Sequence, residues 1–137
     1  MIKISKLTDY AILVLYEMAK NPNTRLSAGY LAQKSGVPDP TVAKLLKIMA
    51  KEDLVKSVRG VNGGYILERA PEEIAVTDVI TAIEGPVTIT ACSDAENEDC
   101  CSLSDNCPAK KGWQAVNAAI TDTLGQMTLA EILKDNQ

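Results

Sequence analysis

The sequence of 137 residues contains no histidine and no phenylalanine, and it has only one tryptophan. Histidine is the side chain that most often serves as a general acid or base near neutral pH. The sequence also has no recognisable nucleophile–base pair and no phosphate-binding loop followed by a P-loop lysine. We therefore expect that the protein is not an enzyme and has no small-molecule substrate.

Long hydrophobic runs and dispersed cysteines are also absent. No apolar run reaches the ~18 residues that a membrane span needs, and the N-terminal segment MIKISKLTDY lacks the layout of a signal peptide. We expect a cytoplasmic protein without membrane contact, in which structural disulfides are uncommon. All four cysteines lie in one acidic segment, ACSDAENEDCCSLSDNCPAK at residues 91–110. Clustered thiols in that compartment indicate metal or redox chemistry.

Basic residues are scarce in the second half of the chain. Residues 1–69 hold 11 Lys and Arg against 6 Asp and Glu, whereas residues 70–137 hold 3 against 12. The N-terminal half is therefore basic within a chain whose total charge is −4. Phosphates respond to the local field of a surface, so this half is a candidate for DNA binding. Charge alone fits equally well with lysines that merely solvate helix faces.

The N-terminal half predicts helices joined by a glycine-containing turn. Residues 6–20 carry an apolar stripe at three- and four-residue spacing. A short helix follows Ser27 and ends near Gly36, and a third covers residues 40–53, with Asp39 as its N-cap and Pro40 at its first position. The second and third helices are predicted to form a helix-turn-helix.

The third helix has two different faces when its residues are placed at ~100° intervals. The aliphatic face holds Val42, Leu45, Leu46 and Met49. The opposite face holds Pro40, Thr41, Lys44, Lys47, Ile48 and Lys51. We expect Thr41 and Lys44, near the end that enters a major groove, to reach bases, and Lys47 and Lys51 to meet phosphates. Any amphipathic surface helix would show a similar pattern.

A glycine-rich hairpin is predicted after the third helix. Residues 54–57 and 64–67 are β-like and enclose VRGVNGG, whose glycines tolerate positive φ. Helix, turn, helix and a hairpin with Arg59, Asn62 and Gly63 near its tip predict a winged helix, with the basic tip in the minor groove. The alternative is an ordinary hairpin with a solvated arginine.

Three further helices are predicted. Residues 71–86 include a helix capped at Thr77 and stopped by Gly85. Residues 109–125 form a long amphipathic helix, and TLAEILKD adds a short one. The stripe on the long helix, which includes Trp113 and Val116, is expected to pack against the same helix of a second subunit, with packing inside one chain as the alternative.

Several segments resemble the Rrf2 family of bacterial winged-helix regulators. These are KLTDYAI at 6–12, VRGVNGGYIL at 58–67, AVTDVITAIEGP at 75–86, and the cysteine loop before a long helix. The segment 101–133 is most similar to the branch that regulates the SUF iron–sulfur assembly operon. The resemblance implies a mainly α fold and a DNA-binding homodimer with one [2Fe-2S] or [4Fe-4S] cluster per subunit. The expected domains are the winged helix at 1–84, the cluster-binding loop at 85–108, and the dimerisation helix and tail at 109–137.

The resemblance also implies a ligand set. Thiolates are soft ligands that suit iron–sulfur clusters, zinc or copper(I). Family members carry three loop cysteines, the last two separated by five residues, as are Cys101 and Cys107. We therefore expect Cys92, Cys101 and Cys107 as ligands, with Cys100 as the alternative to its neighbour.

The fourth ligand of the cluster cannot follow one of the patterns known in the family. In the IscR type a histidine three residues after the last cysteine completes the set, but Lys110 stands there in this sequence. In the NsrR type an aspartate in the first helix of the partner subunit serves, and Asp9 of the partner subunit matches it. The alternative role of Asp9 is that of a first-turn carboxylate favoured by the helix dipole.

The function implied by the resemblance is that of a repressor that senses iron–sulfur status and controls SUF genes. Loss of the cluster would relax the loop and lower DNA affinity. A nitric-oxide sensor of the NsrR type is one alternative. A zinc-stabilised protein-interaction module is another, because zinc also suits thiolates.

Overall fold

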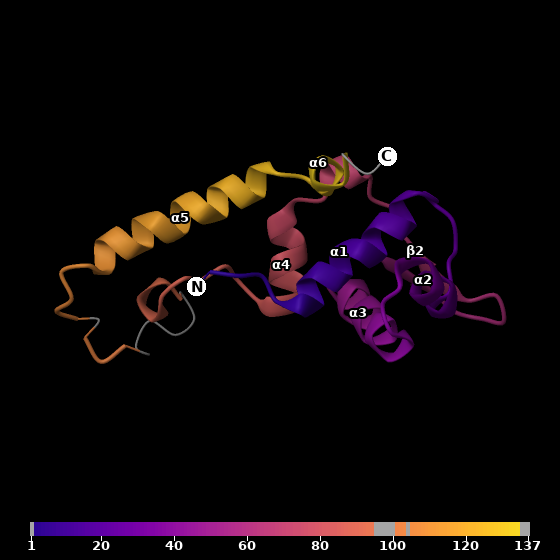
Figure 1. Cartoon of the computed structure of the whole chain (residues 1–137), viewed down its shortest axis with the longest axis horizontal. Coiled ribbons are helices and arrows are strands. Elements are labelled where there is room, and N and C mark those ends of the chain that lie inside the picture. The colour runs from indigo at the N-terminus through magenta and orange to yellow at the C-terminus, as the bar shows by residue number, and fades with distance from the viewer. Residues whose placement is uncertain (1, 95–100, 104, 135–137) are drawn as a thin grey trace.

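The computed structural model describes residues 2–94, 101–103 and 105–134. As predicted, the fold is mainly helical, with a two-stranded antiparallel sheet. Figure 1 shows a compact body of α1–α4 and the hairpin, from which α5 extends as a long arm. The elements in chain order are α1 (Lys6–Ala19), α2 (Ala28–Ser35), α3 (Asp39–Lys51), β1 (Lys56–Val58), β2 (Gly64–Ile66), η1 (Pro71–Glu73), α4 (Val76–Glu84), η2 (Ala91–Ser93), α5 (Lys110–Gln126) and α6 (Leu129–Leu133).

The core is aliphatic, because the sequence supplies no phenylalanine. It lies between α1, α2, α3 and α4, and it is closed by residues that follow β2 and by α6. Burial of these side chains supplies the main favourable free energy of folding. The largest fully buried apolar side chains are Leu15, Met18, Leu31, Leu45, Leu46, Met49, Ile74 and Leu129.

The start of α1 is joined to the end of α4 by polar side chains. The Ser5 hydroxyl accepts a hydrogen bond from the backbone N–H of Thr8 and so caps α1. The Thr8 hydroxyl, which is buried, donates to Glu84 Oε2 at 2.7 Å. The backbone N–H of Ser5 points to the same carboxylate at 3.3 Å. One exposed glutamate therefore satisfies two donors at a helix N-terminus that is 76 and 79 residues away in the sequence.

Helix α2 ends at Gly36, as predicted. Gly36 has a left-handed φ of 79°, and its N–H donates to Ala32 O. The predicted N-cap of α3 is wrong by one residue. Pro38 is the cap, because its carbonyl already accepts from Val42 N at 3.0 Å. Asp39 is thus the first helical residue and makes no capping hydrogen bond, although its charge still suits the helix N-terminus.

The hairpin is shorter than predicted at its first strand. Residues 54 and 55 turn into the core, where both side chains are buried, so β1 begins at Lys56. The register pairs Ser57 with Tyr65. Tyr65 also pairs with Leu26, just before α2, through hydrogen bonds of 2.9 and 2.8 Å. This bridge anchors the hairpin to the helix-turn-helix.

The predicted cap of α4 at Thr77 is also wrong. The helix begins at Val76 after the N-cap Ala75, whose N–H donates to Asp78 Oδ2 at 2.9 Å. Ala75 forms an isolated antiparallel bridge with Thr128. The bridge holds the start of α6 beside the start of α4. Within the described part of the chain, no helix has the length and apolar character that crossing a membrane requires.

Candidate nucleic-acid interface and cysteine segment

Helix α3 places its aliphatic face in the core and its basic face outside. The four aliphatic residues predicted to face inward have no exposed surface. Pro40, Lys44 and Lys47 are exposed and Thr41 is half-buried. Among the described residues, the ion pairs join Lys20 to Glu17, Lys56 to Glu68 and Arg69 to Asp78. The α3 lysines therefore have no ion-pair partner in the described chain.

The hairpin tip is built by two glycines, Gly60 for its backbone conformation and Gly63 because a side chain has no space there. Gly60 has φ 116°, and its carbonyl accepts from Gly63 N at 2.9 Å. A Cβ on Gly63 would lie 2.6 Å from the carbonyl oxygen of Val58. The turn leaves Arg59 and Asn62 exposed at the tip. The tip thus presents one cation and one amide on a tightly folded loop.

A cleft of about 440 Å³ lies between the hairpin tip and α2. Arg25, Ser27 and Tyr30 line it from the α2 side, and Asn62 and Gly63 line it from the tip. The sequence analysis did not single out Arg25 or Tyr30. Arg25 and Tyr30 line the cleft because the bridge between Leu26 and Tyr65 brings two distant segments of the chain together. Such a contact leaves no local pattern in the sequence.

The cysteine segment holds free thiols. Cys92, in η2, is buried, with Sγ 3.2 Å from the Thr90 hydroxyl, and Cys101 and Cys107 are half-buried. Cys100 lies outside the described residues. In the described ranges, no three Cys, His, Asp or Glu side chains are gathered closely enough to hold a metal ion. The three thiols share a segment, but the described structure does not bring them into one ligand set.

The cysteine segment and the residues that lead into it are attached to α5 by amide side chains that the sequence analysis missed. Asn117 bonds to the backbone of Val87 and Ile89 at 3.0 and 2.9 Å, and Gln114 donates to the carbonyl of Cys92 at 3.2 Å. Gln114 and Asn117 lie three residues apart, so they share one face of α5.

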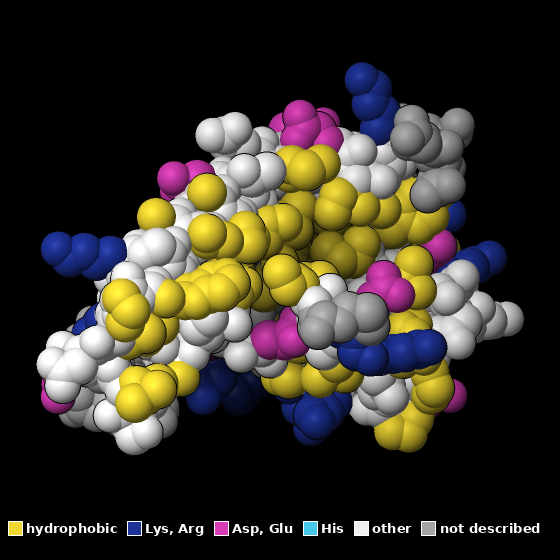
Figure 2. Space-filling model, turned by 60° about the vertical axis from the view of Figure 1, so that its left-hand side comes forward, with side chains coloured by type: hydrophobic (Ala, Val, Ile, Leu, Met, Phe, Trp, Pro, Cys, Tyr) yellow, Lys and Arg dark blue, Asp and Glu magenta, His cyan; other side chains and the backbone are white. Residues whose placement is uncertain are grey.

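An apolar face covers one side of the subunit (Figure 2). No residue of α5 is buried, and Trp113, Val116 and Met127 are 40–45% exposed. Beside α5 lies a cleft of about 490 Å³. The residues that line it come from α1, α4, α5, α6 and the segment before α1: Lys3, Ile4, Lys6, Thr8, Asp9, Ile12, Val76, Ile80, Leu124 and Ile132. Asp9 is an exposed first-turn residue of α1.

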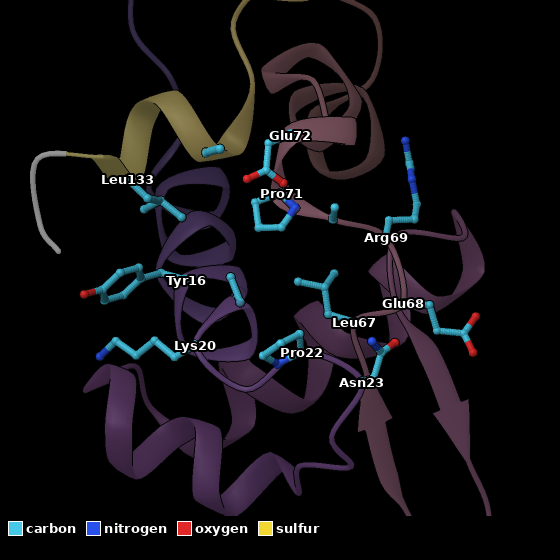
Figure 3. Close-up of a pocket in the computed structure, with 13 residues that line it drawn as sticks. Tyr16, Lys20, Pro22, Asn23, Leu67, Glu68, Arg69, Pro71, Glu72 and Leu133 are labelled. Carbon is cyan, nitrogen blue, oxygen red and sulfur yellow. The ribbon is translucent and has the colours of Figure 1, made fainter.

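Another cleft, of about 640 Å³, lies between the end of α1, the exit from β2 and α6 (Figure 3). Its basic groups have partners within the chain. Lys20 bonds to Glu17 at 3.2 Å, which raises the pKa of Lys20 above its usual value. Arg69 donates to the carbonyl of Glu73 at 2.9 Å. This cleft therefore offers few unpaired charges to a ligand.

A helix-turn-helix followed by a hairpin anchored to it defines a winged-helix protein. A family model described as an iron-dependent transcriptional regulator, Rrf2, matches residues 4–135. The chain belongs to the Rrf2 family and is a DNA-binding transcriptional regulator, not an enzyme.

Similar proteins support this assignment. The HTH-type transcriptional regulator IscR of Sodalis glossinidius is 30% identical over 132 residues, which cover 93% of this chain and 76% of that protein. The structure of CymR, the global cysteine regulator of B. subtilis, has a TM-score of 0.74 at 29% identity and covers 98% of both chains. The T. potens IscR structure has a TM-score of 0.72 at 30% identity, covering 99% of this chain and 89% of that one.

Proposed function

We propose that this chain is a repressor that senses iron–sulfur status through a cluster held by Cys92, Cys101 and Cys107, and that it controls SUF-type assembly genes. The observation that carries the proposal is the set of free thiols in one segment between the winged helix and α5. Thiolates are the usual protein ligands of iron–sulfur clusters. Residues 1–84 then bind DNA, residues 85–108 hold the cluster and residues 109–137 dimerise.

Operator DNA is bound by α3 and the wing. Pro40, Thr41, Lys44 and Lys47 are placed along the α3 surface, with the first three near the end that enters a major groove. Arg59, Asn62 and Gly63 are placed at the wing tip, where the arginine enters the minor groove. The exposure of the α3 lysines and their lack of ion pairs among the described residues support this assignment. Arg25 and Tyr30 extend the surface toward the phosphates.

A second copy of the chain covers the apolar face. Exposed apolar surface of this kind marks an interaction site in a water-soluble protein, and α5 buries none of its residues within the subunit. A two-fold dimer also matches the two half-sites of an operator, about 34 Å apart on one face of the duplex.

The fourth ligand is assigned to Asp9 of the partner subunit. Asp9 lines the cleft beside α5, which is the surface that we assign to the second copy. A carboxylate there completes a set of three thiolates without histidine, which the chain lacks. Asp9→Ala is expected to shorten the lifetime of the bound cluster. An unchanged absorption spectrum together with an unchanged lifetime would reject this role.

The proposal is tested by anaerobic purification, an absorption spectrum, and iron and sulfide analysis. Iron with matching sulfide is expected, together with tighter operator binding by the loaded dimer than by the metal-free dimer at one salt concentration. Zinc in a colourless protein, or no metal after anaerobic reconstitution, would reject the cluster. Equal operator affinity of the two forms would reject the coupling between cluster and DNA binding.

A further inference from the structure

The segment that leads to Cys92 runs along α5 and is held there by one side-chain amide. Asn117 Nδ2 donates to the carbonyl of Val87 at 3.0 Å, and Asn117 Oδ1 accepts from the N–H of Ile89 at 2.9 Å. Both hydrogen-bonding groups of the amide are therefore used on backbone groups two residues apart. A neighbouring β-strand would bond an extended segment in the same way.

The position of the Cys92 thiol follows from this attachment. Gln114, three residues before Asn117 on the same helix, donates to the carbonyl of Cys92 at 3.2 Å. The Thr90 hydroxyl lies 3.2 Å from Cys92 Sγ and 2.7 Å from the Ser93 hydroxyl. A chain of polar contacts thus leads from α5 through residues 87–90 to the sulfur atom.

Apolar packing alone would fix this segment poorly. Helix α5 has no buried residue within the subunit, and Val87, Ile89 and Thr90 are only half-buried. A directional, two-bond contact specifies both the distance and the register of the segment along α5, which a partly exposed apolar contact does not.

We propose that Asn117 is a positioning residue that fixes the Cys92 segment on α5 and thereby sets the exposure of the Cys92 thiol. In the regulator proposed above, on which this part of the inference rests, Asn117 couples the first thiolate to the dimerisation helix. A shift of α5 at the subunit interface then moves Cys92 relative to the other two thiols.

The first test measures the alkylation rates of Cys92, Cys101 and Cys107 in the reduced, metal-free, full-length protein, by mass spectrometry of its peptides after treatment with N-ethylmaleimide. Asn117→Ala is expected to raise the alkylation rate of Cys92 about tenfold, because residues 87–92 can then open locally without breaking the two hydrogen bonds to Asn117. The rates of Cys101 and Cys107 are expected to change less than about twofold. These two thiols therefore serve as internal controls for general loosening.

Asn117→Asp separates hydrogen bonding from packing. This substitution hardly changes the side-chain volume, but it places a carboxylate oxygen against the Val87 carbonyl in place of the donated hydrogen bond. We expect the Cys92 rate to rise in this variant as well. Thr123→Ala, on the exposed part of the same helix, is the matched control and is expected to leave all three rates unchanged.

The outcomes separate this inference from the proposed function. A wild-type Cys92 rate in both Asn117 variants would overturn it, and so would equal acceleration of all three thiols. If the wild-type protein assembles a cluster, the Asn117 variants are expected to lose it several-fold faster in air. If the wild-type protein binds no iron, the proposed function fails, while the alkylation rates still decide the role of Asn117.

Discussion

Substitution of Gly64 by alanine tests how the wing is held on the helix-turn-helix. Gly64 is the first residue of β2, and a Cβ at this position would lie 2.6 Å from the carbonyl oxygen of Leu26 and 2.9 Å from its carbonyl carbon. Both neighbours are backbone atoms, which cannot rotate away as a side chain can. The same stretch carries the two hydrogen bonds between Leu26 and Tyr65, at 2.9 and 2.8 Å. The methyl group therefore pushes apart the bridge that anchors the wing.

The size of the effect follows from two contributions. Two weakened backbone hydrogen bonds account for about 0.5–1.5 kcal/mol each, and overpacking adds about 1–3 kcal/mol. Partial relief by movement of the hairpin lowers the sum, so Gly64→Ala is expected to reduce the free energy of unfolding by about 2–4 kcal/mol. In the proposed regulator, operator affinity is expected to fall as well, because the displaced wing would not meet the minor groove beside α3.

The matched control is Gly29→Ala in α2. A Cβ at Gly29 meets nothing within 4 Å, and alanine is the better helix former by up to about 1 kcal/mol. The free energies of unfolding come from urea titrations followed by circular dichroism, at one protein concentration because a dimer gains stability with concentration. If the free energies of unfolding of the Gly64→Ala and Gly29→Ala variants lie within about 0.5 kcal/mol of each other, the steric argument is wrong.

Further predictions concern the join between α1 and α4, the DNA surface and the dimer. Thr8→Val removes the 2.7 Å hydrogen bond from the buried Thr8 to an exposed carboxylate and is expected to lower the free energy of urea unfolding by about 1–2 kcal/mol. Thr24→Val, whose hydroxyl bonds a carbonyl at the surface, should lower it by less than about 0.5 kcal/mol. Equal losses in the two variants would contradict the argument. Lys47→Ala is expected to reduce the salt slope of operator binding by about 0.9 through loss of one phosphate contact, and an unchanged slope in a salt titration would remove Lys47 from the interface. Val116→Glu is expected to give folded monomers in sedimentation, because Val116 is 43% exposed within the subunit; a dimer of wild-type stability would show that this part of α5 lies outside the interface.

The features that the sequence predicted correctly are those with a period or a steric requirement. The division of α3 into two faces follows from 3.6 residues per turn, and the four predicted inward residues are fully buried. The end of α2 at Gly36 follows from its left-handed φ. Such features depend on neighbours along the chain, so one sequence suffices to find them.

The predicted helix caps failed because a preference for a residue type does not fix the backbone around it. Asp39 and Thr77 are both good capping residues, yet each lies inside its helix by one or two positions. At α3 the carbonyl of Pro38 is already part of the first turn. At α4 the side chain of Asp78 reaches back to the N–H of Ala75 and takes over the role of the cap.

The polar contacts between distant segments had no detectable signal in the sequence. The bond between Thr8 and Glu84 spans 76 residues, and those of Asn117 span 28 and 30 residues. A single asparagine on a surface helix leaves the same sequence pattern whether its side chain is solvated or hydrogen-bonded to the backbone of another segment. The candidate ligand cysteines follow from the resemblance to the Rrf2 family, but the side chains that contact the Cys92 segment are visible only in the folded chain.

The two long-range polar contacts lie at opposite ends of the same stretch of chain. Glu84, the last residue of α4, is bonded to the start of α1, and the stretch that begins at Gly85 is then bonded to α5 by Asn117. Helix α4 packs against α1, α3 and α5. In the proposed regulator, a displacement of residues 87–92 is therefore expected to reach either α5, which carries the apolar face, or α4, which packs against α3, the helix that we propose to read DNA.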